Sequence, residues 1–166
     1  MDKVKPTCGC GCTNVPEQKE KVMENWYLPY MDQKTKGIEV EEKPSPVAVF
    51  YCAGASNVGQ STMLASVKAA NNVGYDRAAL LCLASISAGL KNIHNGAKNA
   101  KGIVSVDGCP MQCARKTLEK DGFVPQKGYV ITRDFEVKKN FDLNSREDIE
   151  KISDAVADGI LEVYNS

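Results

Sequence analysis

The chain alternates short apolar runs with stretches of helical spacing over most of its length. The apolar runs cover residues 47–52, 78–83, 102–107 and 129–132, and helix-length stretches lie between them. Such alternation is typical of βαβ units, whose parallel strands are buried on both faces. The pattern predicts a three-layer α/β domain with a mostly parallel, Rossmann-like sheet of four or more strands and helices on both faces.

The C-terminal region has the clearest helical periodicity. Five apolar residues recur there at helical spacing: Ile149, Ile152, Val156, Ile160 and Val163. Ser145 and Asp148 form a variant of the capping box just before them. We therefore expect a C-terminal helix that Ser145 caps and whose apolar residues share one face.

Residues 1–46 differ from the rest of the chain. They hold a Cys-Gly-Cys-Gly-Cys run and a mixture of lysine and glutamate, and they close with a proline-rich segment at residues 43–46. That segment predicts an extended linker. An aromatic cluster at residues 26–30 is expected to dock on the parent domain. The sequence thus predicts an N-terminal arm over residues 1–46 and an α/β domain over residues 47–166.

Composition narrows the class of protein. The chain has 166 residues, of which 43% are hydrophobic and 25% charged, as expected for one globular domain with a short appendage. The formal net charge of zero argues against nucleic acid as a partner. No apolar run approaches the roughly 20 residues that cross a bilayer, and the N-terminus lacks the apolar region of a secretory signal. We therefore expect a cytoplasmic protein that engages neither nucleic acid nor membrane.

Cysteine is the one unusual feature of the composition. The chain has seven cysteines and a single histidine, His94, which is expected to face solvent on a polar helix. Seven is an odd number, and the expected compartment is reducing, so a disulfide framework is disfavoured. Clustered cysteines in such a setting indicate metal binding or thiol chemistry, and with one histidine any metal site must be rich in thiolates.

Three cysteines stand where apolar runs end. Cys52 closes the first run, Cys82 lies near the end of the second, and Cys109 follows the third. In a parallel sheet all three would lie at the carboxyl edge, where α/β sheets place their ligands. Cys113 follows four residues later, so a helix opened by Cys109 and Pro110 would put both sulfurs on one face. Four converging thiolates suit zinc and equally an iron–sulfur cluster, although Cys82 also fits a buried core position.

Three separate motifs in this region resemble one known family. Residues 107–119, which open with Asp107-Gly108-Cys109-Pro110, resemble the signature of the DGC family, and residues 51–60 and 81–84 resemble its first two strands. The resemblance covers about residues 47–133. It implies a zinc-binding domain with four characteristic cysteines, which map onto Cys52, Cys82, Cys109 and Cys113. It implies no particular biochemical activity.

The arm has a thiol cluster of its own. Cys8, Cys10 and Cys12 are separated by glycines, which impose little steric cost when thiolates wrap around a soft metal. We expect this run to form a second metal site, to complete the first, or to deliver metal to it. The alternative is an oxidation-prone tail with no metal role.

The loop after the first run resembles a phosphate loop. Residues 54–61 fit the pattern G-x-x-x-x-G-K-[ST] except that Gln60 replaces the lysine, which disfavours nucleotide hydrolysis. A weaker expectation remains, because a Gly/Ser/Asn loop that enters a helix can form an anion-binding nest. Ser56, Asn57 and Gln60 would then hold a small anionic ligand. Helix capping is an equally good role for them. Asp107 in turn either lies near a metal or orders the turn after it.

The leading functional hypothesis is a cytosolic thiolate metal-binding protein, with zinc as the metal. Two alternatives come from other classes. One is thiol redox or sulfur-transfer chemistry, with Cys109 as nucleophile and Cys113 as resolving thiol. The other is an iron–sulfur carrier or sensor. The expected binding partner is therefore a metal ion. The sequence leaves open whether the protein is an enzyme.

Overall fold

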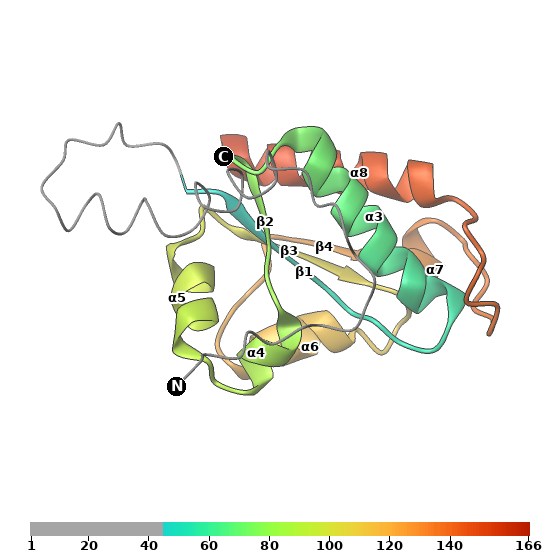
Figure 1. Ribbon diagram of the computed structural model, residues 1–166, viewed down its shortest axis with the longest axis horizontal. Helices are drawn as coiled ribbons and strands as arrows, with labels where there is room; N and C mark the ends of the chain where they lie inside the picture. Colours follow the sequence, from blue (N-terminus) through green and yellow to red (C-terminus); the bar gives the residue numbers. More distant parts are fainter. Residues whose placement is uncertain (1–44) are drawn as a thin grey trace, which may run out of the picture. The chain divides into compact units, whose positions relative to one another are not determined.

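The structure is a computed structural model that describes residues 45–166 of the chain. Four parallel strands form one sheet in the order β2-β1-β3-β4 (Figure 1). Their bounds are β1 (Val47–Tyr51), β2 (Ala78–Leu80), β3 (Ile103–Asp107) and β4 (Lys127–Val130). The predicted parallel α/β fold is therefore confirmed.

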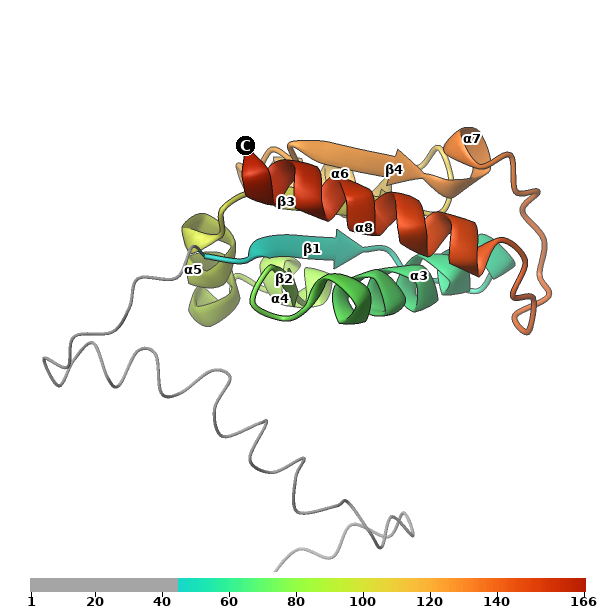
Figure 2. The ribbon, with the colours of Figure 1, turned by 90° about the horizontal axis from the view of Figure 1, so that it is seen from above.

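Helices cover both faces of this sheet. They are α3 (Asn57–Val73), α4 (Leu83–Ser87), α5 (Lys91–Asn99), α6 (Cys113–Lys120), α7 (Ile131–Asp134) and α8 (Ile149–Asn165). Helices α3 and α8 lie side by side on one face, and α4 and α6 lie on the other (Figures 1 and 2). The result is the expected three-layer arrangement.

Strand β1 divides its side chains between two cores. Val47 and Val49 belong to the core beneath α3 and α8, whereas Ala48 and Phe50 belong to the core beneath α4, α5 and α6. All four are fully buried. Alternate residues of a strand point to opposite faces, so a strand covered on both sides must be apolar at every position. This accounts for the unbroken apolar runs of the sequence.

Two strands differ in extent from their apolar runs. Strand β2 ends at Leu80, and α4 begins at Leu83, the last residue of the second apolar run. Strand β4 ends at Val130, and the residues after it form α7. The carboxylate of Asp134 accepts a hydrogen bond from the Val130 amide at 2.7 Å, which turns the chain out of the sheet. Hydrophobicity alone could not locate these ends.

The C-terminal helix forms as predicted, but its capping box does not. Helix α8 begins at Ile149, and its apolar stripe is buried against α3 and the sheet. Asp148 has a φ of 60°, and no side chain caps the helix. The Ser145 amide donates instead to the Asp142 carbonyl at 3.3 Å. The preceding loop therefore makes its own turn, which removes Ser145 from the helix end.

His94 is half-buried, which corrects the expectation that it faces solvent. Its ring makes an edge contact with Phe123, with centroids 5.4 Å apart. Its Nε2 atom lies 3.1 Å from the Ile86 carbonyl oxygen. The single histidine therefore serves the packing of α5.

The predicted arm over residues 1–46 lies almost wholly outside the described residues, and its boundary with the domain stays a prediction. Within residues 45–166, no helix has the length and apolar character needed to cross a membrane.

Alanine substitutions at two helical glycines test the packing of α8 on β4. A Cβ atom at Gly159 would collide with the ring of Tyr129, whose hydroxyl donates to the Ala155 carbonyl at 2.7 Å. A Cβ at Gly96 would lie 3.6 Å from Leu81, an ordinary contact. Gly159→Ala should lower the free energy of unfolding by about 1–3 kcal/mol through overpacking. Gly96→Ala should raise it by about 0.5–1 kcal/mol through helix propensity. Urea denaturation of both variants measures the difference, and equal effects would contradict this packing.

Candidate functional site

The strand order reverses between β1 and β3. The chain passes from β1 to β2 on one side and then returns to form β3 on the other side of β1. The segments after β1 and β3 lead to α3 and α6, which lie on opposite faces (Figure 1). Ligands of open α/β sheets bind at the carboxyl ends of strands at such a switch point. Cys52 and the segment from Asp107 to Cys113 lie at these two strand ends.

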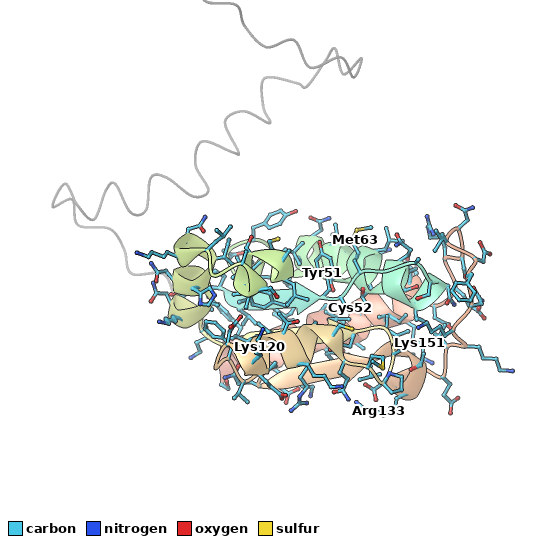
Figure 3. All side chains as sticks on the ribbon, turned by 90° about the horizontal axis from the view of Figure 1, so that it is seen from below. Tyr51, Cys52, Met63, Lys120, Arg133 and Lys151 are labelled. Atoms are coloured by element: carbon cyan, nitrogen blue, oxygen red, sulfur yellow. The ribbon has the colours of Figure 1, made fainter. Side chains whose placement is uncertain are left out.

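Cys52 continues the line of β1 and is held there by the backbone. Its amide donates to the Val106 carbonyl at 3.0 Å, and its half-buried Sγ accepts a hydrogen bond from the Gly108 amide at 3.1 Å. The Thr62 hydroxyl donates to the Cys52 carbonyl. Burial raises the pKa of the Cys52 thiol, and the Gly108 amide opposes that shift. Figure 3 shows Cys52 from the side of α4 and α6.

Two glycines allow this contact. A Cβ atom at Gly108 would lie 3.0 Å from both the carbonyl carbon and the oxygen of Val58. One at Gly59 would lie 2.9 Å from the Gly54 nitrogen. The first turn of α3 therefore packs directly on the backbone after β3 because Gly108 lacks a side chain, and the loop after β1 packs on the same turn because Gly59 lacks one. This close approach brings the Gly108 amide onto the Cys52 sulfur.

Asp107 organises the other side of the switch point. Its side chain is buried, with 1% exposure, and its carboxylate oxygens accept hydrogen bonds from the amides of Ala114 at 2.7 Å and Arg115 at 3.2 Å. Burial raises the pKa of the Asp107 carboxyl, and these amides oppose the rise. Asp107 thus satisfies two free donors at the start of α6. Of its two predicted roles, ordering the turn is the one that this geometry supports.

The segment from Cys109 to Gln112 is a turn, which corrects the prediction that Cys109 opens a helix. The Gln112 amide donates to the Cys109 carbonyl at 3.0 Å, and Gln112 has a left-handed φ of 50°. Helix α6 then begins at Cys113. Pro110 fits the second position of a β-turn as well as a first helical turn, so the sequence did not separate them. The two sulfurs therefore do not share a helical face.

The structure places all four predicted cysteines at the carboxyl edge as free thiols. Cys109 is half-buried, and its Sγ lies 3.9 Å from the Nζ atom of Lys139. Cys113 is exposed at the start of α6. Cys82 is exposed just before α4, where hydrogen bonds with Ser85 lower the pKa of its thiol.

A pocket of about 510 Å³ adjoins these thiols. Cys82 lines it, and Cys52 lies in the chain between two other lining residues, Tyr51 and Ala53. Thr117, one helical turn beyond Cys113, contributes to the opposite wall. The pocket therefore lies between the ends of β1 and β2 and the helices of one face.

The thiols suit a soft metal by their chemistry, but they are not gathered around one point. Within the described part of the chain, no three side chains of cysteine, histidine, aspartate or glutamate form a group that could hold a metal ion. The assignment of Cys52, Cys82, Cys109 and Cys113 as metal ligands stays a prediction. That of Cys8, Cys10 and Cys12 concerns residues outside the described range.

The residues of the expected anion nest make hydrogen bonds within the domain. Ser56 caps α3 by accepting from the Gly59 amide at 3.2 Å, and the Gln60 side chain donates to the Gly54 carbonyl at 2.9 Å. Asn57 is 1% exposed, and its backbone amide donates to the backbone carbonyl of Asn140 at 3.1 Å. Capping, the alternative role, therefore describes what Ser56 does here. An anionic ligand at this loop stays a prediction.

Sequence reasoning missed the loop that reaches back to the site. The Asn57 side chain donates to the Lys138 carbonyl at 2.9 Å and accepts from the Asn140 amide at 2.7 Å. These bonds fix the backbone on either side of Lys139, whose ammonium group lies beside Cys109. More than 80 residues separate Asn57 from this loop. The loop has no periodicity that could have indicated the contact.

The contribution of the Asp107 cap on α6 can be measured as a change in the free energy of unfolding. Asp107→Ala should lower the free energy of unfolding by about 1–2 kcal/mol, because two helix amides lose their acceptor. The control is Asp121→Ala at the exposed end of the same helix, which should change stability by less than about 0.5 kcal/mol. Urea denaturation compares the two. A neutral Asp107→Ala would show that the carboxylate does not hold α6.

The thiols should differ in reactivity. Iodoacetamide should alkylate Cys82 faster than Cys52 at neutral pH, because thiolate is the reactive form, Cys82 is exposed and Ser85 lowers its pKa. Burial raises the pKa of Cys52, so its rate should begin to rise at a higher pH. Peptide mass spectrometry on chelator-treated protein follows both rates. Ser85→Ala should slow Cys82 alone, and equal initial rates for the two thiols would contradict these environments.

Comparison with known proteins bears on the whole domain. A profile of the DGC domain matches residues 48–156, well over half of the 166-residue chain. Neither a search of curated proteins nor a search of solved structures found a significant match. The matched range contains the four cysteines of the carboxyl edge and the Asp107-Gly108-Cys109 segment that links β3 to α6. The chain belongs to the DGC domain family, a family of cysteine-containing domains.

Proposed function

We propose that this domain binds a soft metal ion, zinc before others, through the thiolates of Cys52, Cys82, Cys109 and Cys113. The observation that carries the proposal is the delivery of four free thiols to one edge of the sheet by three neighbouring strands. Zinc is commonly held by cysteine sulfur in tetrahedral sites, and a set of four thiolates is a frequent arrangement.

Two other residues of types that commonly bind zinc are already engaged. The Asp107 carboxylate accepts two hydrogen bonds from α6, and the ring of His94, on α5, packs against Phe123. A metal that binds at the switch point therefore has sulfur as its main donor. Sulfur donors favour zinc and other soft ions over magnesium or calcium.

Several local features place a hydrogen-bond donor or a positive charge beside these sulfurs. The Gly108 amide points at the Cys52 sulfur, and the Lys139 ammonium lies beside that of Cys109. Cys113 is the first residue of α6, where the positive end of the helix dipole stabilises a negative charge. Cys109 stands on a turn and Cys82 precedes the short helix α4, so both can adjust without disturbing the sheet. Bound zinc would supply a structural tie between these segments.

One observation favours a second function. The Lys139 ammonium lies 3.9 Å from Cys109 Sγ, an environment that also suits a nucleophilic thiol. In that case the Cys109 thiolate would attack a disulfide of the substrate and release one substrate sulfur as a thiol. Cys113 would then attack the mixed disulfide at Cys109 and release the second substrate thiol, so that the protein is oxidised to the Cys109–Cys113 disulfide and the substrate is reduced, which is the redox alternative. Reactive thiols in metal-free protein would favour it. Iron with acid-labile sulfide would instead favour the iron–sulfur alternative.

Metal content tests the proposal. The full chain, purified without oxygen and with Cys8, Cys10 and Cys12 changed to serine, should hold about one zinc per molecule. Cys52→Ser, Cys109→Ser and Cys113→Ser should each reduce the content severalfold, because the site loses a thiolate. Met111→Ser, in the same turn but without loss of a thiol, is the matched control and should retain the metal. Inductively coupled plasma mass spectrometry measures the content.

Two results would overturn the zinc proposal. One is metal-free protein from an anaerobic preparation that also fails to take up added zinc. The other is zinc content that every cysteine variant retains, which would move the ion away from this edge.

A further inference from the structure

We propose that the pocket beside the thiols is a binding site for an uncharged, largely apolar small molecule that carries a hydrogen-bond acceptor. The inference goes beyond metal binding and does not depend on it. It stands on the lining of the pocket, on its volume and on its place in the fold.

No aspartate, glutamate, lysine, arginine or histidine lines this pocket. Its wall consists of leucine, alanine and a few small polar residues: Tyr51, Ala53, Leu80, Leu81, Cys82, Leu83, Ala84, Ser87 and Thr117. A charged ligand would find no opposite charge in this wall to offset the hydration that it loses. An uncharged ligand avoids that cost, and burying its apolar surface on the leucine side chains favours binding.

The polar groups in the wall indicate what the ligand carries. Tyr51, Ser87 and Thr117 each bring a hydroxyl that can donate a hydrogen bond. Within residues 45–166, no hydrogen bond joins these hydroxyls to another residue. A carbonyl or ether oxygen on the ligand would accept from them. Sites of this kind combine an apolar wall with a few polar groups that fix orientation.

Volume and position both favour a small molecule as the occupant. About 510 Å³ is within the range of roughly 300–1,000 Å³ that is usual for such sites. The pocket also lies at the carboxyl ends of β1 and β2, the edge at which parallel sheets bind ligands. Helix α4 supplies one wall and α6 the other, and these two helices contact each other.

The test uses the neutral naphthalene ketone 6-propionyl-2-(dimethylamino)naphthalene, whose emission shifts to the blue in apolar surroundings. It is uncharged, apolar and carries one carbonyl acceptor. Titration of the full chain into the dye should give a saturable blue shift. Ala84→Trp, at an exposed position of α4, should fill the pocket and weaken dye binding by about tenfold or more.

The matched control is Ala88→Trp. Ala88 is also exposed and caps the same helix, but it does not line the pocket. Its dye affinity should stay within about twofold of the parent, because a tryptophan there leaves the wall intact. Equal weakening by both variants, or no saturable shift with the parent chain, would overturn the inference.

Two further measurements test the uncharged ligand class and distinguish ligand binding in this pocket from zinc binding. The anionic dye 1-anilinonaphthalene-8-sulfonate should bind at least about tenfold more weakly than the neutral dye, and equal affinity would contradict the uncharged ligand class. Saturable dye binding by metal-free protein would support the proposed binding site even if the protein does not bind zinc.

Discussion

The contact between the Gly108 amide and the Cys52 sulfur sets the geometry of this edge of the molecule. It forms because the first turn of α3 lies directly on the backbone that follows β3, where a Cβ atom at Gly108 would press against Val58. A side chain at Gly108 would push these segments apart. Cys52 would lose its donor, and the turn that carries Cys109 would move with it. Glycine is required here for close approach, and not for an unusual φ.

Asp107, the residue before Gly108, holds the following helix, α6. Its carboxylate reaches forward to two amides of α6 while its backbone remains in β3. The turn from Cys109 to Gln112 is thus closed at both ends, by the cap on α6 and by the packing of Gly108. Cys113, the first residue of α6, therefore keeps a fixed position relative to Cys52. Each member of the Asp107-Gly108-Cys109 segment has a separate physical task.

The rest of the domain positions this edge without taking part in its chemistry. The sheet is covered on both faces, so β1 and β3 are rigid and buried, and their ends are fixed. The reversal of strand order between them places Cys52 in direct contact with the segment after β3. A site on such a frame can rearrange at Cys82 and Cys109 while its base stays in place.

The sequence predicted the features that depend on local pattern. Strands that are apolar at every position indicated a sheet that is buried on both faces. Cysteines at the ends of these strands indicated that the candidate site lies at the carboxyl edge of the sheet. It could not separate a helix from a β-turn at Pro110, because proline suits both. It misplaced His94, whose contact with Phe123 depends on tertiary packing. It missed Lys139, which reaches Cys109 only through the long-range bonds of Asn57.

The central claim is that one metal ion gathers the thiols of this edge. X-ray absorption spectroscopy at the zinc edge, on the zinc-loaded chain without the arm cysteines, counts the ligands directly. The account predicts a first shell of four sulfurs at about 2.3 Å. A shell made only of oxygen and nitrogen at about 2.0 Å would contradict it.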